Sequence, residues 1–174
     1  MSRFNYMSDD YLSTVFADES FTCDCCKKIS NAKYIGPQYS TADNDASLCP
    51  DCIQTGEAVQ SGLVDFFNEI DPECVDENVS SEISCRTPGI FTWQDQEWAT
   101  HCNDACEYHG DATAQDIIKA DEKTIQIWME RYDQSRNDWD TFMSGYQPGG
   151  YQGVINSRVN SATLSFLIGI SHSS

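Results

Sequence analysis

Positively charged residues are scarce in this 174-residue chain, which has ten Lys and Arg against 28 Asp and Glu, and a net charge of −18. Between Tyr34 and Ile118 the one basic residue is Arg86, while 17 residues are acidic. Proteins that bind nucleic acids neutralise phosphates with Lys and Arg, and anionic lipid surfaces attract the same side chains. We therefore expect neither nucleic acid nor a membrane as a partner. The negative electrostatic field of the chain would instead attract a basic protein.

Long apolar runs are also lacking. The longest, Leu164–Ile170, contains Ser165 and Gly169 and is far shorter than the roughly 20 residues of a transmembrane helix. The first six residues show no apolar stretch of the kind found in signal peptides. We therefore expect a cytoplasmic protein with reduced thiols, which also fits the odd number of cysteines, nine.

Common catalytic signatures are absent from the sequence. It contains no glycine-rich phosphate-binding loop, no nucleophile elbow and no H-E-x-x-H motif. Carboxylates are numerous, but no pair stands out by its spacing for acid–base chemistry. The sequence therefore favours a protein that is not an enzyme.

The composition nevertheless predicts a folded chain, because 40% of the residues are hydrophobic and include four Trp, eight Tyr and eight Phe. We predict an α+β fold in which a small zinc-ribbon-like lobe with short strands packs with several helices. Residues 1–20 are predicted to be a loosely packed N-terminal arm and residues 21–174 a single domain. Within it, the lobe covers about residues 21–56, and helices and strands make up residues 57–174.

Hydrophobic spacing and turn residues predict the individual elements. Apolar residues at helical spacing predict helices over residues 59–70, around residues 93–101 and over residues 118–142. Strands are predicted at residues 33–39, 83–86 and 162–170. Gly110 is expected in a left-handed conformation beyond the second helix, and Thr113 and Asp116 have the spacing of a capping box.

Two cysteine knuckles form the clearest motif. Each has the spacing C-x2-C, and 22 residues separate them. Zinc prefers a tetrahedron of thiolates, and a tight knuckle offers two sulfurs to one ion. We predict that one Zn²⁺ is bound by Cys23, Cys26, Cys49 and Cys52. Four thiolates leave no position for water, so the predicted role is structural. Cys25 competes with Cys26 as a ligand, and a set of buried free cysteines is the alternative.

A second cluster of thiol and imidazole residues has three interpretations. On a helix, Trp98, Cys102 and Cys106 share one face, which suits core packing. The same residues suit a second metal site or a catalytic Cys–His pair. His101 and Cys102 point in different directions on a helix, which weakens the catalytic interpretation. The candidates for this second site are Cys85, His101, Cys102, Cys106 and His109.

A run of carboxylates is the candidate partner-binding surface. Such a run attracts a basic partner and accelerates its association at low salt. A solvated face that only aids solubility is the alternative. The acidic surface, as this set is called below, comprises Asp65, Glu69, Asp71, Glu73, Asp76, Glu77 and Glu82.

Five short motifs follow one another between residues 34 and 106. They are YIGPQY at residues 34–39, LCPDCIQTGEA at residues 48–58, RTPGIF at residues 86–91, WQ at residues 93–94 and W-x2-HC-x-D-x-C at residues 98–106. In this order they resemble the CbrC family of bacterial proteins, over roughly residues 20 to 110. The resemblance implies a bacterial cytosolic protein, a zinc-binding pair of knuckles and a role in tolerance of a nuclease colicin. That family typically ends in a further C-x2-C-G ribbon, which residues 162–174 lack.

The leading hypothesis is an immunity or tolerance protein that binds a basic bacterial toxin, with a nuclease as the favoured class. Its carboxylates would occupy the cleft that the toxin uses for phosphates. The alternatives are a metal- or thiol-dependent enzyme that uses His101, Cys102 and Cys106, and a zinc-stabilised adaptor for another basic partner.

Overall fold

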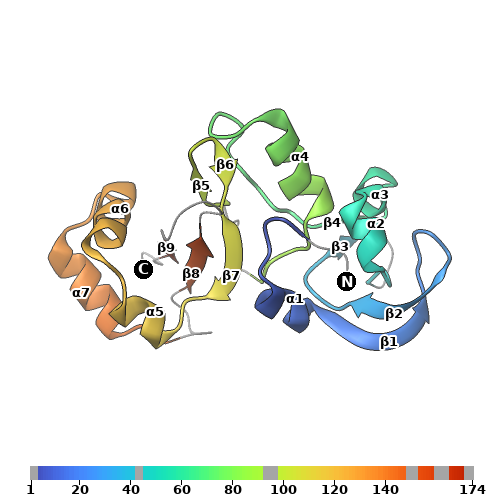
Figure 1. The fold of residues 1–174 in the computed structure, drawn as a ribbon, viewed down its shortest axis with the longest axis horizontal. Helices are drawn as coiled ribbons and strands as arrows, with labels where there is room; N and C mark the ends of the chain where they lie inside the picture. Colours follow the sequence, from blue (N-terminus) through green and yellow to red (C-terminus); the bar gives the residue numbers. More distant parts are fainter. Residues whose placement is uncertain (1–3, 42–44, 92–97, 148–152, 159–164, 171–174) are drawn as a thin grey trace. The chain divides into compact units, whose positions relative to one another are not determined.

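The computed structural model describes residues 4–41, 45–91, 98–147, 153–158 and 165–170 (Figure 1). The chain divides into two compact units, which we call unit 1 (Met1–Ala105) and unit 2 (Cys106–Ser174). Both combine short helices with small antiparallel sheets, which confirms the predicted α+β class. Among the described residues, no helix has the length and apolar character needed to cross a membrane.

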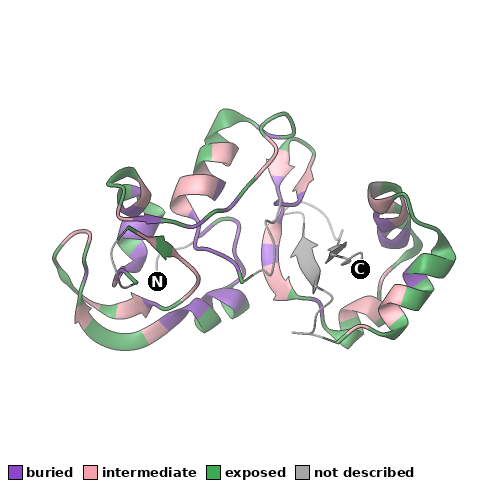
Figure 2. Ribbon diagram, turned by 180° about the vertical axis from the view of Figure 1, so that it is seen from behind, coloured by how far each residue is buried: buried purple, intermediate pink, exposed green. Residues whose placement is uncertain are grey.

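Unit 1 begins with helix α1 (Asp9–Val15), and strand β1 (Phe16–Thr22) follows directly. The Ser8 side chain caps α1 by accepting a hydrogen bond from the Tyr11 amide. Strand β1 pairs antiparallel with β2 (Ile29–Tyr34). The prediction of a loosely packed arm is wrong, because this segment supplies part of the core of unit 1. Its buried hydrophobic residues are Phe4, Tyr6, Met7, Tyr11, Leu12, Val15 and Phe16. Figure 2 colours the ribbon purple wherever a residue is buried.

Tyr34 is buried in the core of unit 1. Its ring centroid lies 5.4 Å from that of Phe16 and 5.6 Å from that of Phe66. Its hydroxyl donates to the Pro37 carbonyl at 2.7 Å and accepts from the Gly89 amide at 3.0 Å. Burial raises the pKa of Tyr34, so the hydroxyl keeps the proton that it donates. The sequence motifs at residues 34–39 and 86–91 therefore meet in the core and have a structural role.

The segment after the second knuckle differs from the prediction. It forms α2 (Pro50–Gln54) and α3 (Glu57–Gln60), and then strand β4 (Val64–Asp65), which pairs with β3 (Tyr39–Ser40). The predicted helix over residues 59–70 is wrong, because Gly62 adopts a φ of 72° just after α3. From residue 64 to residue 69, buried and exposed side chains alternate as in a strand.

Helix α4 (Glu77–Arg86) replaces the strand predicted over residues 83–86. Asp76 caps this helix, because its side chain accepts from the amides of Asn78 and Val79. Ile83 is fully buried on the inner side of α4. Residues 83–86, for which a strand was predicted, are therefore the last turn of a helix.

Strands β5 (Thr100–His101) and β6 (Asp104–Ala105) form a tight hairpin. Its two turn residues, Cys102 and Asn103, have φ values of 54° and 61°, as in a two-residue hairpin turn with left-handed central residues. The helix predicted around residues 93–101 is wrong from residue 98 onward, and Trp93 lies outside the described residues.

Unit 2 contains an antiparallel sheet in the order β7, β8, β9. Gly110, in β7, has a φ of 85°, at a register shift in the pairing with β8 and not beyond a helix. The strand predicted over residues 162–170 is present within the described residues. The strands are β7 (Glu107–Asp111), β8 (Gly153–Arg158) and β9 (Ser165–Ile170).

Three helices occupy the part of unit 2 where one long helix was predicted: α5 (Ala114–Ile118), α6 (Glu122–Tyr132) and α7 (Arg136–Ser144). Asp121 and Ser135 cap α6 and α7, and Asp133, with a φ of 49°, ends α6. The predicted capping box at Thr113 and Asp116 is confirmed. Ala112, Ile125, Trp128 and Trp139 form a buried core in this part of unit 2.

Candidate metal centre and acidic surface

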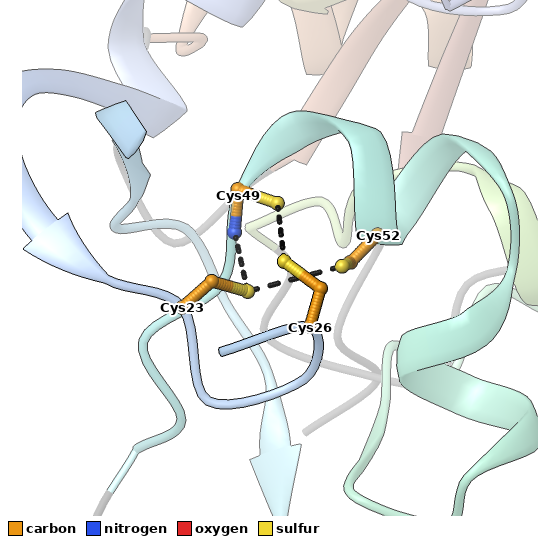
Figure 3. A group of neighbouring side chains, drawn as sticks. All are labelled: Cys23, Cys26, Cys49 and Cys52. Atoms are coloured by element: carbon orange, nitrogen blue, oxygen red, sulfur yellow. Dashed lines mark hydrogen bonds between the residues drawn. The ribbon is translucent and has the colours of Figure 1, made fainter. Parts of the chain in front are cut away.

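The first knuckle is the turn of the β1–β2 hairpin. The Cys23 amide donates to the Lys28 carbonyl at 2.9 Å, and the Lys27 amide donates to the Cys23 carbonyl at 2.9 Å. Lys27 has a φ of 58°, so the chain reverses within a few residues. This reversal brings the Cys23 and Cys26 side chains to the same side of the turn (Figure 3).

The second knuckle begins helix α2. Cys49 is its N-cap and Pro50 its first residue, a position that suits proline because the missing N–H has no partner there. Asp24 joins the two knuckles: its amide donates to the Ser47 carbonyl at 2.8 Å, and its side chain accepts from the Ser47 amide at 2.8 Å. These two hydrogen bonds link the knuckles in addition to the contacts between the sulfurs.

The four predicted thiols lie in one tight cluster (Figure 3). The Sγ atoms of Cys23 and Cys52 are 3.8 Å apart, and those of Cys26 and Cys49 are 3.9 Å apart. All four sulfurs lie within 4.8 Å of one another. A tetrahedron with Zn–S bonds of about 2.3 Å has edges of roughly 3.8 Å. The cluster therefore fits a metal ion such as zinc, and the separations are too long for disulfides.

Burial works against charge on these thiols. It raises the pKa of Cys49 and of Cys52, and neighbouring thiols raise that of Cys52 further. Burial also acts on Cys23, but the backbone amides of Cys26, Cys49 and Cys25 hold the pKa of Cys23 below its usual value. The Cys49 amide, for example, lies 3.4 Å from the Cys23 sulfur. Thiols with raised pKa must lose protons before they can bind Zn²⁺.

Zinc affinity should therefore rise with pH. Each thiol that gives up a proton on binding contributes about a tenfold increase per pH unit below its pKa. Because the pKa values of Cys49 and Cys52 are raised, we expect affinity to be about 100-fold or more higher at pH 8 than at pH 7. Competition with a zinc chelator of known pH dependence measures this ratio. Equal affinities at the two pH values would contradict the assignment of these ligands.

Cys25 lies beside the cluster and not in it. Its sulfur, the Cys52 sulfur and a Glu57 carboxylate oxygen form a second group with mutual distances within 4.8 Å. The Cys52 sulfur and Glu57 Oε2 are 3.9 Å apart. Cys26, and not Cys25, therefore completes the four-thiol group, which resolves the ambiguity between these two neighbours.

The second cysteine–histidine cluster was predicted on the assumption that Cys102 and Cys106 lie on one helix, and the structure has no helix there. Cys102 lies exposed in the β5–β6 turn, while Cys106 is buried at the start of unit 2. They are not on one helical face, because residues 100–105 form a hairpin. His109 Nε2 lies 2.8 Å from Glu107 Oε2, and the Cys85 sulfur lies 3.6 Å from Ser84 Oγ. The described residues therefore give no support for a second metal site or a thiol catalyst formed by Cys85, His101, Cys102, Cys106 and His109, and both stay predictions.

The acidic surface lies on β4, on the segment after it and on α4. Asp65, Glu69, Glu73, Asp76 and Glu77 are exposed, and the other two members are partly buried.

Several carboxylates of the acidic surface already have hydrogen-bond or ion-pair partners within unit 1. Asp71 accepts from the Glu73 amide at 2.8 Å, and Asp76 caps α4. Glu82 accepts from the Asn5 side chain at 2.8 Å and lies 3.5 Å from the Arg86 guanidinium. By contrast, Glu73 and Glu77 have exposed side chains, which makes them suited to mutational tests of binding.

Two residues that organise this region were not predicted from the sequence. Asp24 joins the knuckles, and its position between two cysteines was the available signal. Asn68 is 5% exposed, and its amide group donates to three backbone carbonyls at the end of α4 and beyond it. No pattern in the sequence distinguishes a buried asparagine of this kind from one in a surface turn.

A comparison with protein families matches residues 1–158 to UPF0167, described as an uncharacterised protein family. The chain belongs to the UPF0167 family. One relative, UPF0167 protein PA1536 of Pseudomonas aeruginosa, is 29% identical over 154 residues, which cover 86% of each chain. Another, UPF0167 protein Mb2317 of Mycobacterium bovis, is 32% identical over 120 residues, or 67% of this chain and 64% of the relative. No solved structure matches this UPF0167 chain.

The match extends well beyond residues 20–110, where the family resemblance was seen in the sequence. The relatives are bacterial, as the resemblance implied. The name CbrC and the role in colicin tolerance are not part of the description of UPF0167, so both stay predictions.

Proposed function

We propose that this UPF0167 protein is a cytoplasmic immunity or tolerance protein that binds a basic bacterial toxin, with a nuclease as the favoured class of toxin. The acidic surface of unit 1 makes the contact, and a structural Zn²⁺ in the four-thiol cluster stabilises the unit. The observation that carries this proposal is the group of exposed carboxylates on β4, α4 and the segment between them.

The stretch of sequence that carries the acidic surface contains almost no basic residues to neutralise its negative charge. Arg86 is the one basic residue between Tyr34 and Ile118, and it lies 3.5 Å from Glu82 at the far end of α4. Repeated carboxylates without intervening Lys or Arg resemble the phosphates that a nuclease binds. They also accelerate encounter with a positively charged partner.

The metal site is better suited to stability than to catalysis. Four thiolates fill the tetrahedral shell of Zn²⁺ and leave no coordination position for water or a substrate. Cys23, Cys49 and Cys52 are also buried, which separates the ion from any macromolecular partner. A surface interaction is therefore the function that the described residues support best.

The test is binding to basic nuclease toxins encoded next to UPF0167 genes, measured at 50 and 300 mM NaCl. We expect affinity to fall several-fold at the higher salt, because exposed charges are screened. Replacing Glu73→Gln together with Glu77→Gln should weaken binding about fivefold at low salt. Both side chains are exposed, so the fold should be retained.

The matched control is Glu122→Gln with Glu130→Gln, which removes the same charge from α6 of unit 2. It should leave affinity within about twofold of the unmodified protein. Cys102→Ala should also leave binding and toxin protection unchanged, whereas a thiol enzyme would lose its activity. Affinity that does not respond to salt, or that falls equally in both double variants, would contradict an interface on the acidic surface.

A further inference from the structure

Two aromatic rings are displayed together on the surface of unit 1. Tyr39 in β3 is 65% exposed, and Phe67, just after β4, is 55% exposed. Their ring centroids are 4.5 Å apart and their planes meet at 69°. Aromatic residues are enriched at the centres of protein interfaces, where they supply much of the binding energy. We call Tyr39 and Phe67 the aromatic pair.

The backbone of Phe67 is held in an unfavourable conformation that places its ring outside. Its φ of 49° lies in the left-handed region, which non-glycine residues rarely adopt. Asp65 stabilises this turn by accepting a hydrogen bond from the Phe67 amide at 2.8 Å. Phe66 and Asn68, on either side, are 4% and 5% exposed. An exposed Phe in a strained conformation is unfavourable for the free protein, which points to a role in binding.

The residues around the aromatic pair indicate which kind of side chain a partner would place there. Tyr39 and Asp65 are directly paired across the β3–β4 ladder, so their side chains lie on the same face. Asp65 and Glu69 are both exposed. Aromatic ring faces attract cations, and carboxylates bind guanidinium groups in a planar arrangement. An arginine side chain satisfies both preferences, because it stacks on rings and forms paired hydrogen bonds.

We propose that the aromatic pair anchors the interface by receiving an arginine side chain of the basic protein partner, which stacks on the rings and pairs with Asp65. This inference rests on the proposed function and names the residues that give the acidic surface its specificity. Long-range charge brings the partner to unit 1, and the aromatic pair distinguishes arginine from lysine.

The test uses the full-length, zinc-loaded protein and an acetylated octa-arginine peptide, with octa-lysine as the comparison. Calorimetry at 300 mM NaCl reduces the contribution of exposed charges. We expect Phe67→Gly to weaken octa-arginine binding about tenfold, with a smaller effect on octa-lysine. Glycine adopts a φ of 49° without strain, so this variant should fold at least as well as the unmodified protein.

A second comparison separates loss of the ring from general effects of surface mutation. Phe67→Leu should weaken octa-arginine binding, whereas Phe91→Leu should not. Phe91 is 61% exposed in the same unit, so the two substitutions remove rings of similar exposure. Equal effects of the two substitutions would overturn the proposal.

The acidic double variant Glu73→Gln with Glu77→Gln separates the two proposals. If it weakens binding at low salt while Phe67→Gly does not, the acidic surface stands and the arginine anchor is overturned. If Phe67→Gly alone weakens binding, the anchor stands and the electrostatic proposal fails. Sedimentation of the free protein tests whether the aromatic pair instead mediates self-association. Self-association that Phe67→Gly abolishes would assign the aromatic pair to a second copy of the chain and overturn the arginine anchor.

Discussion

Replacing Cys49→Ser should abolish stoichiometric zinc binding and unfold much of unit 1. Structural zinc contributes on the order of 10–16 kcal/mol to the folding of zinc-finger peptides, more than the whole stability of many domains. Serine is a favourable N-cap, and Cys49 is the N-cap of α2 without a side-chain capping bond. The substitution therefore tests the metal and preserves the start of the helix. Zinc analysis and thermal unfolding by circular dichroism measure the two effects.

The control for this experiment is Cys74→Ser. Cys74 is exposed, and its sulfur lies 3.3 Å from Asp71 Oδ2, outside the four-thiol cluster. Its replacement should leave about one zinc per chain and change the melting temperature little. Full zinc content in Cys49→Ser, or equal loss of zinc in both variants, would refute the predicted ligand set.

Replacing Asn68→Asp should destabilise unit 1 by about 3 kcal/mol or more at pH 7. The Asn68 amide donates to the carbonyl oxygens of Ile83, Thr87 and Pro88 at 3.2, 3.0 and 3.1 Å. A carboxylate at this buried position would face three acceptors without a proton to donate. The change would also release the segment that carries Phe67 and Glu69 from the end of α4. Urea denaturation measures the loss of stability.

Asn78→Asp is the matched control, because it makes the same chemical change at an exposed position in the first turn of α4. A negative charge there interacts favourably with the helix dipole, so its stability should change by less than about 0.5 kcal/mol. Burial raises the folded-state pKa of the carboxyl introduced at position 68 above its unfolded value of about 3.9. The difference in stability between the Asn68→Asp and Asn78→Asp variants should therefore become smaller as the pH falls from 7 towards 4. A constant difference would contradict the electrostatic explanation.

The metal centre could be predicted because the two cysteines of each knuckle lie close together in the sequence. Each knuckle places two sulfurs on one turn, so the C-x2-C spacing determines which pairs can bind together, and the duplicate spacing identifies the partners. Helix capping was similarly local: Thr113 and Asp116 form the capping box that their spacing indicated. These features depend on residues within one turn of one another.

The elements between the local motifs could not be predicted, since distant residues determine them. Val59, Leu63 and Phe66 have helical spacing, yet the strand at Val64–Asp65 forms because β3 lies beside it and Gly62 ends the preceding helix. The hairpin at residues 100–105 likewise replaced a plausible helical face. Phe66 and Phe67 are adjacent apolar residues in the sequence, and only the folded structure decides that Phe66 is buried and Phe67 exposed.

By itself the sequence determined the composition of the thiol cluster, the excess of carboxylates and the α+β class, because each follows from residue types and short spacings. The tertiary structure alone decided that much of residues 4–16 is buried in the core of unit 1, that Tyr34 joins two motifs, and that Asp65 lies opposite Tyr39 in an exposed aromatic pair. The physical reason is that burial and side-chain direction depend on which segments pack together. A residue's neighbours in the chain do not contain that information.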